Sequence, residues 1–168
     1  MRVAVVRSVP IIVIVIGAGF GIVPAEAKSS PAFSSVSAAA SDQHDVIASF
    51  TETGVGSTQV VAERLRGKAT DSYACYTADG QRAGSAALIE HPSNQDQFQA
   101  NTEGTIGPAT LAISVVPLDV CSAGQTAYLF KTIFAHLRLT DLTNHVSVGI
   151  AESFTSCSPA DCQPPSHL

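Results

Sequence analysis

The chain has 168 residues, with 14 acidic against 9 basic side chains and a net charge of −5. This acidic balance disfavours nucleic acid and anionic membrane surfaces as partners, because both attract clustered Lys and Arg. The length fits one domain with its own core, which Val, Ile, Leu, Phe, Ala and Tyr must build because Trp is absent.

Residues 1–27 have the three regions of a secretory signal peptide. Arg2 and Arg7 give a charged start, residues 9–23 are almost wholly apolar, and Ala-Glu-Ala ending at Ala27 is a small-x-small cleavage site. The apolar run is shorter than the roughly 20 residues of a spanning helix, which disfavours a membrane anchor. We therefore expect cleavage after Ala27, a secreted, extracellular protein and no membrane partner afterwards.

Residues 28–43 are rich in Ser and Ala and are predicted to be a flexible linker. The folded domain is predicted over residues 44–157. Its strands before the last hairpin are expected at residues 46–51, 59–62, 65–75, 85–91, 98–102 and 109–116, with a polar loop at 93–97. Residues 158–168 contain three Pro and are predicted to be an irregular tail.

The side chains from Arg64 to residue 75 alternate between the two faces of a predicted strand. Apolar residues such as Leu65 and Tyr73 share one face, whereas Arg64, Arg66 and Lys68 lie on the other. We interpret the basic face as solvated.

The most apolar part of the chain is a predicted hairpin, with strands at residues 126–139 and 146–154 and a turn at 141–144. In the first strand the period of two places Leu129, Ile133, Ala135, Leu137 and Leu139 on one face and Tyr128, Phe130, Phe134, His136 and Arg138 on the other. The aromatic face of Tyr128, Phe130 and Phe134 is a candidate binding face if the other sheet leaves it uncovered, and part of the core otherwise.

The pattern of strands indicates the fold class. Seven to nine short strands, with turns about every ten residues and no helical periodicity, predict an all-β protein. We expect an immunoglobulin-like or Greek-key β-sandwich, with a closed barrel as the alternative.

The four cysteines are Cys75, Cys121, Cys157 and Cys162, an even number that predicts two disulfides in an exported chain. Three pairings are possible. Cys157 and Cys162 are close enough to join through a turn, which leaves Cys75 to pair with Cys121 across the domain. No zinc-binding spacing occurs, so we predict neither a metal nor a cofactor.

The sequence contains no clear catalytic pattern. Ser is plentiful but no Gly-x-Ser-x-Gly motif occurs. The five histidines, His44, His91, His136, His145 and His167, are dispersed along the chain. The acidic residues are interpreted as an ordinary solvated surface, including Glu52, Glu90, Glu103, Asp119 and Glu152. We therefore predict no catalytic residue.

Three short motifs follow one another along the chain: Tyr73-x-Cys75, Cys121-x-x-Gly124-Gln125 and Leu137-x-Leu139-Thr140-Asp141. In this order the chain resembles a loose family of small secreted actinobacterial β-sandwich proteins of unknown function. The resemblance covers residues 46–154 and implies the fold and export but no activity. The Cys-x4-Cys segment at residues 157–162 is similar to a loop of the exported apoproteins that carry enediyne chromophores, and it implies no ligand site here.

Two functions stay open from the sequence. The first is a secreted non-catalytic module that binds a small molecule or a surface partner. The second is a secreted protease-inhibitor-like protein, which would present residues 117–124 around Cys121 as an exposed loop, or a small hydrolase. An exposed loop at Cys121 would favour an inhibitor, and a cleft with convergent His and carboxylates would favour an enzyme.

Overall fold

The computed structural model describes residues 30–168, so the predicted signal peptide lies outside the described residues. Within 30–168 the chain forms strands and connecting loops and contains no helix. Accordingly, this part of the chain offers no helix of the length and hydrophobicity needed to cross a membrane. The all-β prediction is confirmed.

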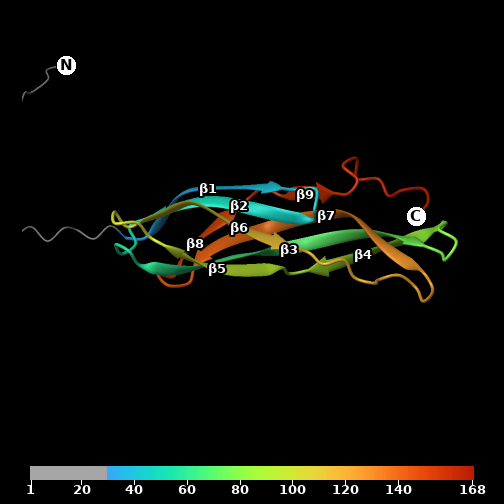
Figure 1. Ribbon diagram of the computed structural model, residues 1–168, viewed down its shortest axis with the longest axis horizontal. Helices are drawn as coiled ribbons and strands as arrows, with labels where there is room; N and C mark the ends of the chain where they lie inside the picture. Colours follow the sequence, from blue (N-terminus) through green and yellow to red (C-terminus); the bar gives the residue numbers. More distant parts are fainter. Residues whose placement is uncertain (1–29) are drawn as a thin grey trace, which may run out of the picture.

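The strands form two sheets that lie over one another (Figure 1). The smaller sheet has the order β1 (Ala32–Ala40), β2 (Asp45–Thr53) and β6 (Thr105–Ser114). The larger sheet has the order β4 (Arg82–Glu90), β3 (Val60–Tyr76), β7 (Thr126–Asp141) and β8 (Val146–Ile150), with β5 (Ser93–Gln99) also paired to β3 and β9 (Phe154–Cys157) to β7. All neighbouring strands are antiparallel.

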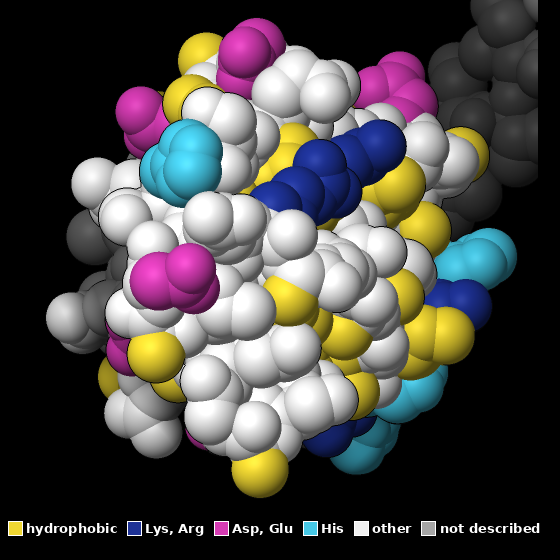
Figure 2. Space-filling model, turned by 90° about the vertical axis from the view of Figure 1, so that its right-hand side faces the viewer, with side chains coloured by type: hydrophobic (Ala, Val, Ile, Leu, Met, Phe, Trp, Pro, Cys, Tyr) yellow, Lys and Arg dark blue, Asp and Glu magenta, His cyan; other side chains and the backbone are white. Residues whose placement is uncertain are grey.

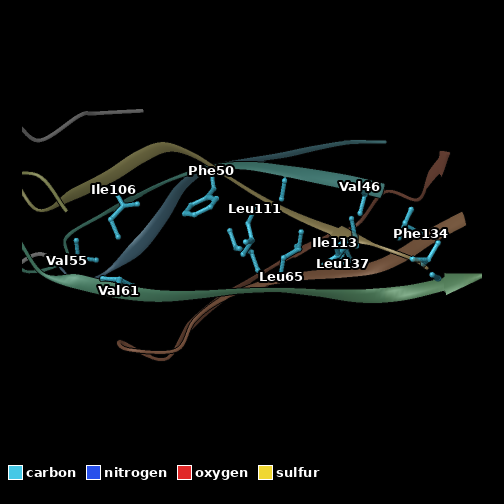
Figure 3. Close-up of a cluster of buried hydrophobic side chains, with 14 of the residues drawn as sticks. Val46, Phe50, Val55, Val61, Leu65, Ile106, Leu111, Ile113, Phe134 and Leu137 are labelled. Carbon is cyan, nitrogen blue, oxygen red and sulfur yellow. The ribbon is translucent and has the colours of Figure 1, made fainter. Parts of the chain in front are cut away.

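The hydrophobic core fills the space between the two sheets (Figure 3). Alternate residues of β2, including Val46 and Phe50, point down toward alternate residues of β3, including Val61 and Leu65. Phe50 also packs edge-on against Phe98, with ring centroids 5.3 Å apart. Burying a side chain of this size contributes about 2–3 kcal/mol, so the two-residue period of these strands holds the layers together.

The predicted faces of β7 are partly wrong because two bulges change the alternation. The register with β3 shifts near Phe130 and again at His136, whose φ is 54°. An extra residue in one strand moves all following side chains to the opposite face. As a result Phe134 is 0 % exposed in the core beside Leu137, whereas Ile133 is only half-buried.

The predicted flexible linker at residues 28–43 is wrong over most of its length. Residues 32–40 form β1, which pairs with β2 along its whole length. Small Ser and Ala side chains fit this position because β1 is an edge strand with mostly exposed or half-buried residues. The composition of residues 28–43 gives no sign that β2 offers backbone groups with which this segment can pair.

Other strand boundaries also differ from the predictions. The two strands expected at residues 59–62 and 65–75 are one continuous strand, β3, and the polar loop expected at residues 93–97 belongs to β5. The long strand expected at residues 146–154 is divided into β8 and the start of β9. Polar residues tolerate strand geometry in β5 because that strand is almost entirely exposed.

Both predicted disulfides are confirmed. Cys75 pairs with Cys121, with Cα atoms 5.7 Å apart, and Cys157 pairs with Cys162 at 4.9 Å. Two disulfides and no free cysteine indicate an oxidising environment. The tail after β9 contains no strand, as expected, although it returns to the β3–β4 turn, where the Leu168 amide donates to the Gly80 carbonyl.

Candidate functional site

A break in the larger sheet positions the candidate site. On one edge of β3, β4 ends at Glu90 opposite Ala69, and β5 begins at Ser93 opposite Arg66. On the outer edge of β7, β8 pairs with residues 137–141 and β9 with residues 131–134. Both partners of the β3–β7 pair therefore change at the same level, and we call this level the waist of the sheet.

The waist carries an open groove of about 860 Å³ on the outer face of the sheet. Its basic and His side chains are Arg64, Arg66, Lys68, Arg138, His91 and His136. The first four are the majority of the six Lys and Arg residues within 30–168, and no acidic residue lines the groove. An acidic chain thus concentrates its positive charge at one place. In Figure 2, Lys or Arg side chains adjoin His side chains along the lower right rim.

Two arginines face each other across the groove. Arg66 of β3 is the register partner of Arg138 of β7, so both side chains leave the same face of adjacent strands. Like charges directly opposite each other destabilise a sheet unless an anion neutralises them. The side-chain hydrogen bond that Arg138 makes is to the Ser147 hydroxyl at 3.0 Å, a neutral partner. The guanidinium groups therefore keep donors free for a ligand.

The floor of the groove is shaped by a close approach between β3 and β7. A Cβ atom added at Gly67 would lie 2.5 Å from Cδ2 of Leu137, so only glycine fits without movement. The Gly67 amide donates to the Pro92 carbonyl at 3.1 Å, which holds the β4–β5 connection against the waist. Gly149 opposite Arg138 adds no side chain, and the groove stays open between the basic residues.

The aromatic face predicted for binding is not a continuous surface. Phe134 belongs to the core, as described above. Tyr128 is half-buried and packs edge-on against Tyr76, with ring centroids 6.5 Å apart, and its hydroxyl donates to the Ser158 carbonyl at 3.1 Å. Phe130 is also half-buried, beside the β9 connection. The Tyr128 hydroxyl and the Phe130 carbonyl thus hold Ser158, just after β9, against β7.

A buried polar network lies between the start of β2 and the larger sheet. The Thr132 hydroxyl donates to Asp71 Oδ1 at 2.7 Å, and its oxygen lies 3.2 Å from His44 Nδ1. The His44 amide donates to the Ser156 hydroxyl at 2.9 Å. Burial lowers the pKa of His44 and raises that of Asp71, so the arrangement favours a neutral imidazole. His44 is only 8 % exposed, and this position gives the network a structural role.

Three acidic side chains are buried together at the other end of the sandwich. Glu52, Glu63 and Asp141 are all 0 % exposed, and each brings a carboxylate oxygen within 4.8 Å of the others. The interpretation of Glu52 as solvated surface is therefore wrong. Burial, and then the neighbouring Glu63 carboxyl, raises the pKa of Glu52 to about 9, and burial raises that of Glu63 to about 7.

The sequence contained a signal for the buried acids and for part of the basic groove. Glu52 continues the inward series Val46, Ala48, Phe50, and Glu63 stands between Val61 and Leu65 on the inward face of β3. The period of two thus places both acids in the core. Conversely, Arg64, Arg66 and Lys68 were correctly assigned to the outer face of β3, but Arg138 joins them only through the register of β7.

The loop around Cys121 is exposed, as an inhibitor would require. Residues 115–125 form no strand, and Val116 and Leu118 are 71 % and 46 % exposed. The loop is held at Cys121 by the disulfide and at Leu118, whose amide donates to the Tyr73 hydroxyl at 3.3 Å. It is therefore anchored at two points on β3.

Comparison with known proteins adds no family to these observations. The chain matches no family model, and no curated protein or solved structure is significantly similar to it.

Proposed function

We propose that the protein is a secreted, non-catalytic β-sandwich module that binds an anionic ligand in the groove at the waist of the larger sheet. The ligand carries two or more phosphate, sulfate or carboxylate groups. The observation that carries this proposal is the opposed pair Arg66 and Arg138, flanked by Arg64 and Lys68 and facing no acidic residue in the groove.

The arrangement of the basic residues supports a ligand with several charges. Arg64 and Arg66 lie two residues apart on one strand, so their Cα atoms are separated by about 6.6 Å. Arg138 adds a third guanidinium from the neighbouring strand. Planar guanidinium groups bind the oxygens of phosphate, sulfate and carboxylate in pairs. A ligand with neighbouring anionic groups would contact several of these side chains together.

The residues that line the groove do not support a catalytic reaction there. His91 and His136 are both exposed there, but no carboxylate converges on them. His136 lies on the outer face of β7, whereas Asp141 is buried on the inner face. A general base held by a third group is therefore missing from the groove lining, which favours binding over catalysis.

Export belongs to the same proposal. The charged, apolar and small-residue regions of residues 1–27 and the two disulfides support a secreted protein. N-terminal sequencing of the protein from culture medium should begin at Lys28. A secreted chain that keeps residues 9–23 would contradict the signal peptide.

Binding is tested on the secreted protein by NMR titration with inorganic pyrophosphate and, separately, with sucrose octasulfate. Backbone amide signals of Gly67, Arg138 and Gly149 are expected to shift with at least one probe, and the preferred probe separates phosphate from sulfate recognition. The double substitution of Arg66 and Arg138 by Gln should weaken binding roughly a hundredfold, because each lost charge-assisted hydrogen bond removes about 1.5–3 kcal/mol.

The matched control is Arg82→Gln, which removes an exposed positive charge outside the groove. This variant should bind the preferred probe within about twofold of the wild type, and added salt should weaken both proteins in parallel. Equal losses in Arg82→Gln and the groove variant would instead mean diffuse charge attraction. Unshifted groove amides with both probes would remove the groove as a site.

The exposed loop supports a second function, inhibition of a serine protease that accepts Leu. Leu118 is 46 % exposed and lies three residues before the disulfide at Cys121. The protein is assayed against subtilisin and chymotrypsin, with Leu118→Asp as the variant. Wild-type inhibition that is abolished in Leu118→Asp would support this function, and simple cleavage of the loop would contradict it.

A further inference from the structure

The buried acids Glu52, Glu63 and Asp141 form a cluster assembled from both sheets. Glu63 of β3 and Asp141 of β7 are register partners on the inner face of the larger sheet. Glu52 reaches them from β2 of the smaller sheet. Each acid has an apolar neighbour on the inner face of its own strand, namely Phe50 on β2, Leu65 on β3 and Leu139 on β7. Apolar side chains therefore border the three carboxyl groups.

The three carboxyl groups differ in their hydrogen bonds. Asp141 Oδ1 accepts from the Thr143 and Asn144 amides at 2.7 and 2.8 Å, and Oδ2 accepts from the Asn144 side chain at 2.6 Å. Both oxygens of Glu52 and both oxygens of Glu63 are buried without a hydrogen-bond donor among residues 30–168. Among the described residues, these four acceptor atoms thus lack a positive or donating partner.

Within the part of the chain that the structure describes, no basic side chain pairs with Glu52 or Glu63. The neighbours of Glu63 along β3 include Arg64, but the alternation of the strand sends that side chain to the outer groove. Buried carboxylates without partners lose several kcal/mol of hydration each, so proteins pair them or use them to hold a metal ion. A cation from solution would supply what the chain does not.

We propose that Glu52, Glu63 and Asp141 bind one Ca²⁺ ion between the two sheets. Ca²⁺ takes oxygen ligands at about 2.3–2.6 Å, so two oxygens on one ion lie no more than about 5 Å apart. The oxygens of the cluster meet this limit, since one from each residue lies within 4.8 Å of the others.

The chemistry of the cluster selects among metals. All three side chains offer carboxylate oxygen, whereas structural zinc sites use Cys and His. Mg²⁺ usually keeps several of its waters, and the apolar enclosure of the cluster disfavours them. Ca²⁺ accepts both oxygens of a carboxylate, so Glu52 and Glu63 would provide up to four oxygens beside one from Asp141.

The site would join the two layers of the sandwich. Glu52 is its contribution from the smaller sheet, and Glu63 and Asp141 come from the larger one. This site is independent of the outer groove, because it lies on the opposite face of β3. Loss of anion binding would therefore leave Ca²⁺ binding in place.

The test is equilibrium dialysis of the EDTA-treated secreted protein against Ca²⁺ at pH 8, with the bound metal counted by mass spectrometry. Roughly one Ca²⁺ per chain is expected, with a rise of several degrees in the melting temperature at saturation. Glu63→Gln and, separately, Glu52→Gln should weaken Ca²⁺ binding at least thirtyfold and abolish the rise. Glu103→Gln, which changes an exposed acid, should retain both.

Three results would overturn the proposal. Wild-type protein that binds no Ca²⁺ at millimolar concentration would mean that the carboxyl groups share protons instead. Undiminished binding in both glutamine variants would place the ion elsewhere. Stoichiometric Mg²⁺ or Zn²⁺ binding without Ca²⁺ binding would reject the choice of metal.

Discussion

Two buried polar clusters connect the sheets of this protein, and they differ in the balance of donors and acceptors. In the first, Thr132 links Asp71 and His44, and Ser156 accepts the His44 amide. In the second, Glu52 and Glu63 present only acceptors to each other. The residues of both clusters are buried, so burial alone does not distinguish them. In the first cluster the chain satisfies Asp71 Oδ1 and His44 Nδ1, and its only buried side-chain atoms without a partner among residues 30–168 are His44 Nε2 and Asp71 Oδ2. In the second cluster all four oxygens of Glu52 and Glu63 lack one, so this cluster depends more strongly on protons or a cation.

A large loss of stability is expected from breaking the cluster of His44, Asp71 and Thr132. Thr132→Val keeps the shape of the side chain but removes the hydroxyl between Asp71 and His44. Unfolding by urea should show a loss of about 3 kcal/mol, because a buried carboxyl and imidazole each lose a partner. Thr140→Val, on the outer face of the same strand, should change the unfolding free energy by less than about 0.5 kcal/mol. Equal losses in the two variants would remove the special role of the network.

The acidic cluster should make the EDTA-treated protein less stable at high pH. The pKa of Glu63 is raised to about 7 and that of Glu52 to about 9, so the folded state holds protons that the unfolded chain releases near pH 4.5. Their stabilising contribution is complete below pH 4.5 and is lost as the pH rises through 7 and 9. Urea unfolding should show a loss of several kcal/mol between pH 5 and pH 8, because both groups contribute over this interval. Stability that rises over this interval would contradict the raised pKa values.

Removing one acid should reverse the usual penalty of a core substitution. In EDTA at pH 8, Glu63→Gln should raise the unfolding free energy by about 1 kcal/mol, because a buried ionisable group becomes neutral. With saturating Ca²⁺ the wild type should be the more stable of the two. A variant that is less stable than the wild type in EDTA would show that the Glu63 charge is already compensated by the chain.

The smallest effect on stability is expected at the groove. Arg66→Gln removes one of two like charges in register and should change the unfolding free energy by no more than about 0.5 kcal/mol in either direction. The same substitution should weaken pyrophosphate or sucrose octasulfate binding roughly tenfold. A strongly destabilised Arg66→Gln would instead indicate that its aliphatic part supports the sheet.

The sequence predicted the features that depend on local alternation and on cysteine number. The inner face of β3 and both disulfide pairs were identified correctly. The bulges near Phe130 and at His136 were not, because an extra residue leaves no mark in composition. Together they reverse the faces of the residues between them. Strand β1 was missed for a related reason, since its Ser and Ala residues are ordered by pairing with β2.

The candidate sites needed the register of distant strands. Arg64, Arg66 and Lys68 are close in sequence and share a face, but the opposed Arg138 lies more than seventy residues later. Glu52, Glu63 and Asp141 come from three strands, whereas from the sequence alone the acidic residues are interpreted together as solvated surface and Asp141 is placed in a turn. The alternation of inward and outward side chains applies to charged residues as well as to apolar ones. Applied in this way, it predicts that Glu52 and Glu63 are buried.

The waist of the larger sheet has a mechanical consequence. At this level β3 and β7 have no continuous strand on either outer side, and the bulge at His136 interrupts their own pairing. Fewer backbone hydrogen bonds between strands cross the sheet at this level than above or below it, so we expect the sheet to bend here first. A small bend of the sheet would change the distance between the Arg66 and Arg138 guanidinium groups. The affinity for an anion would then depend on how easily the sheet bends.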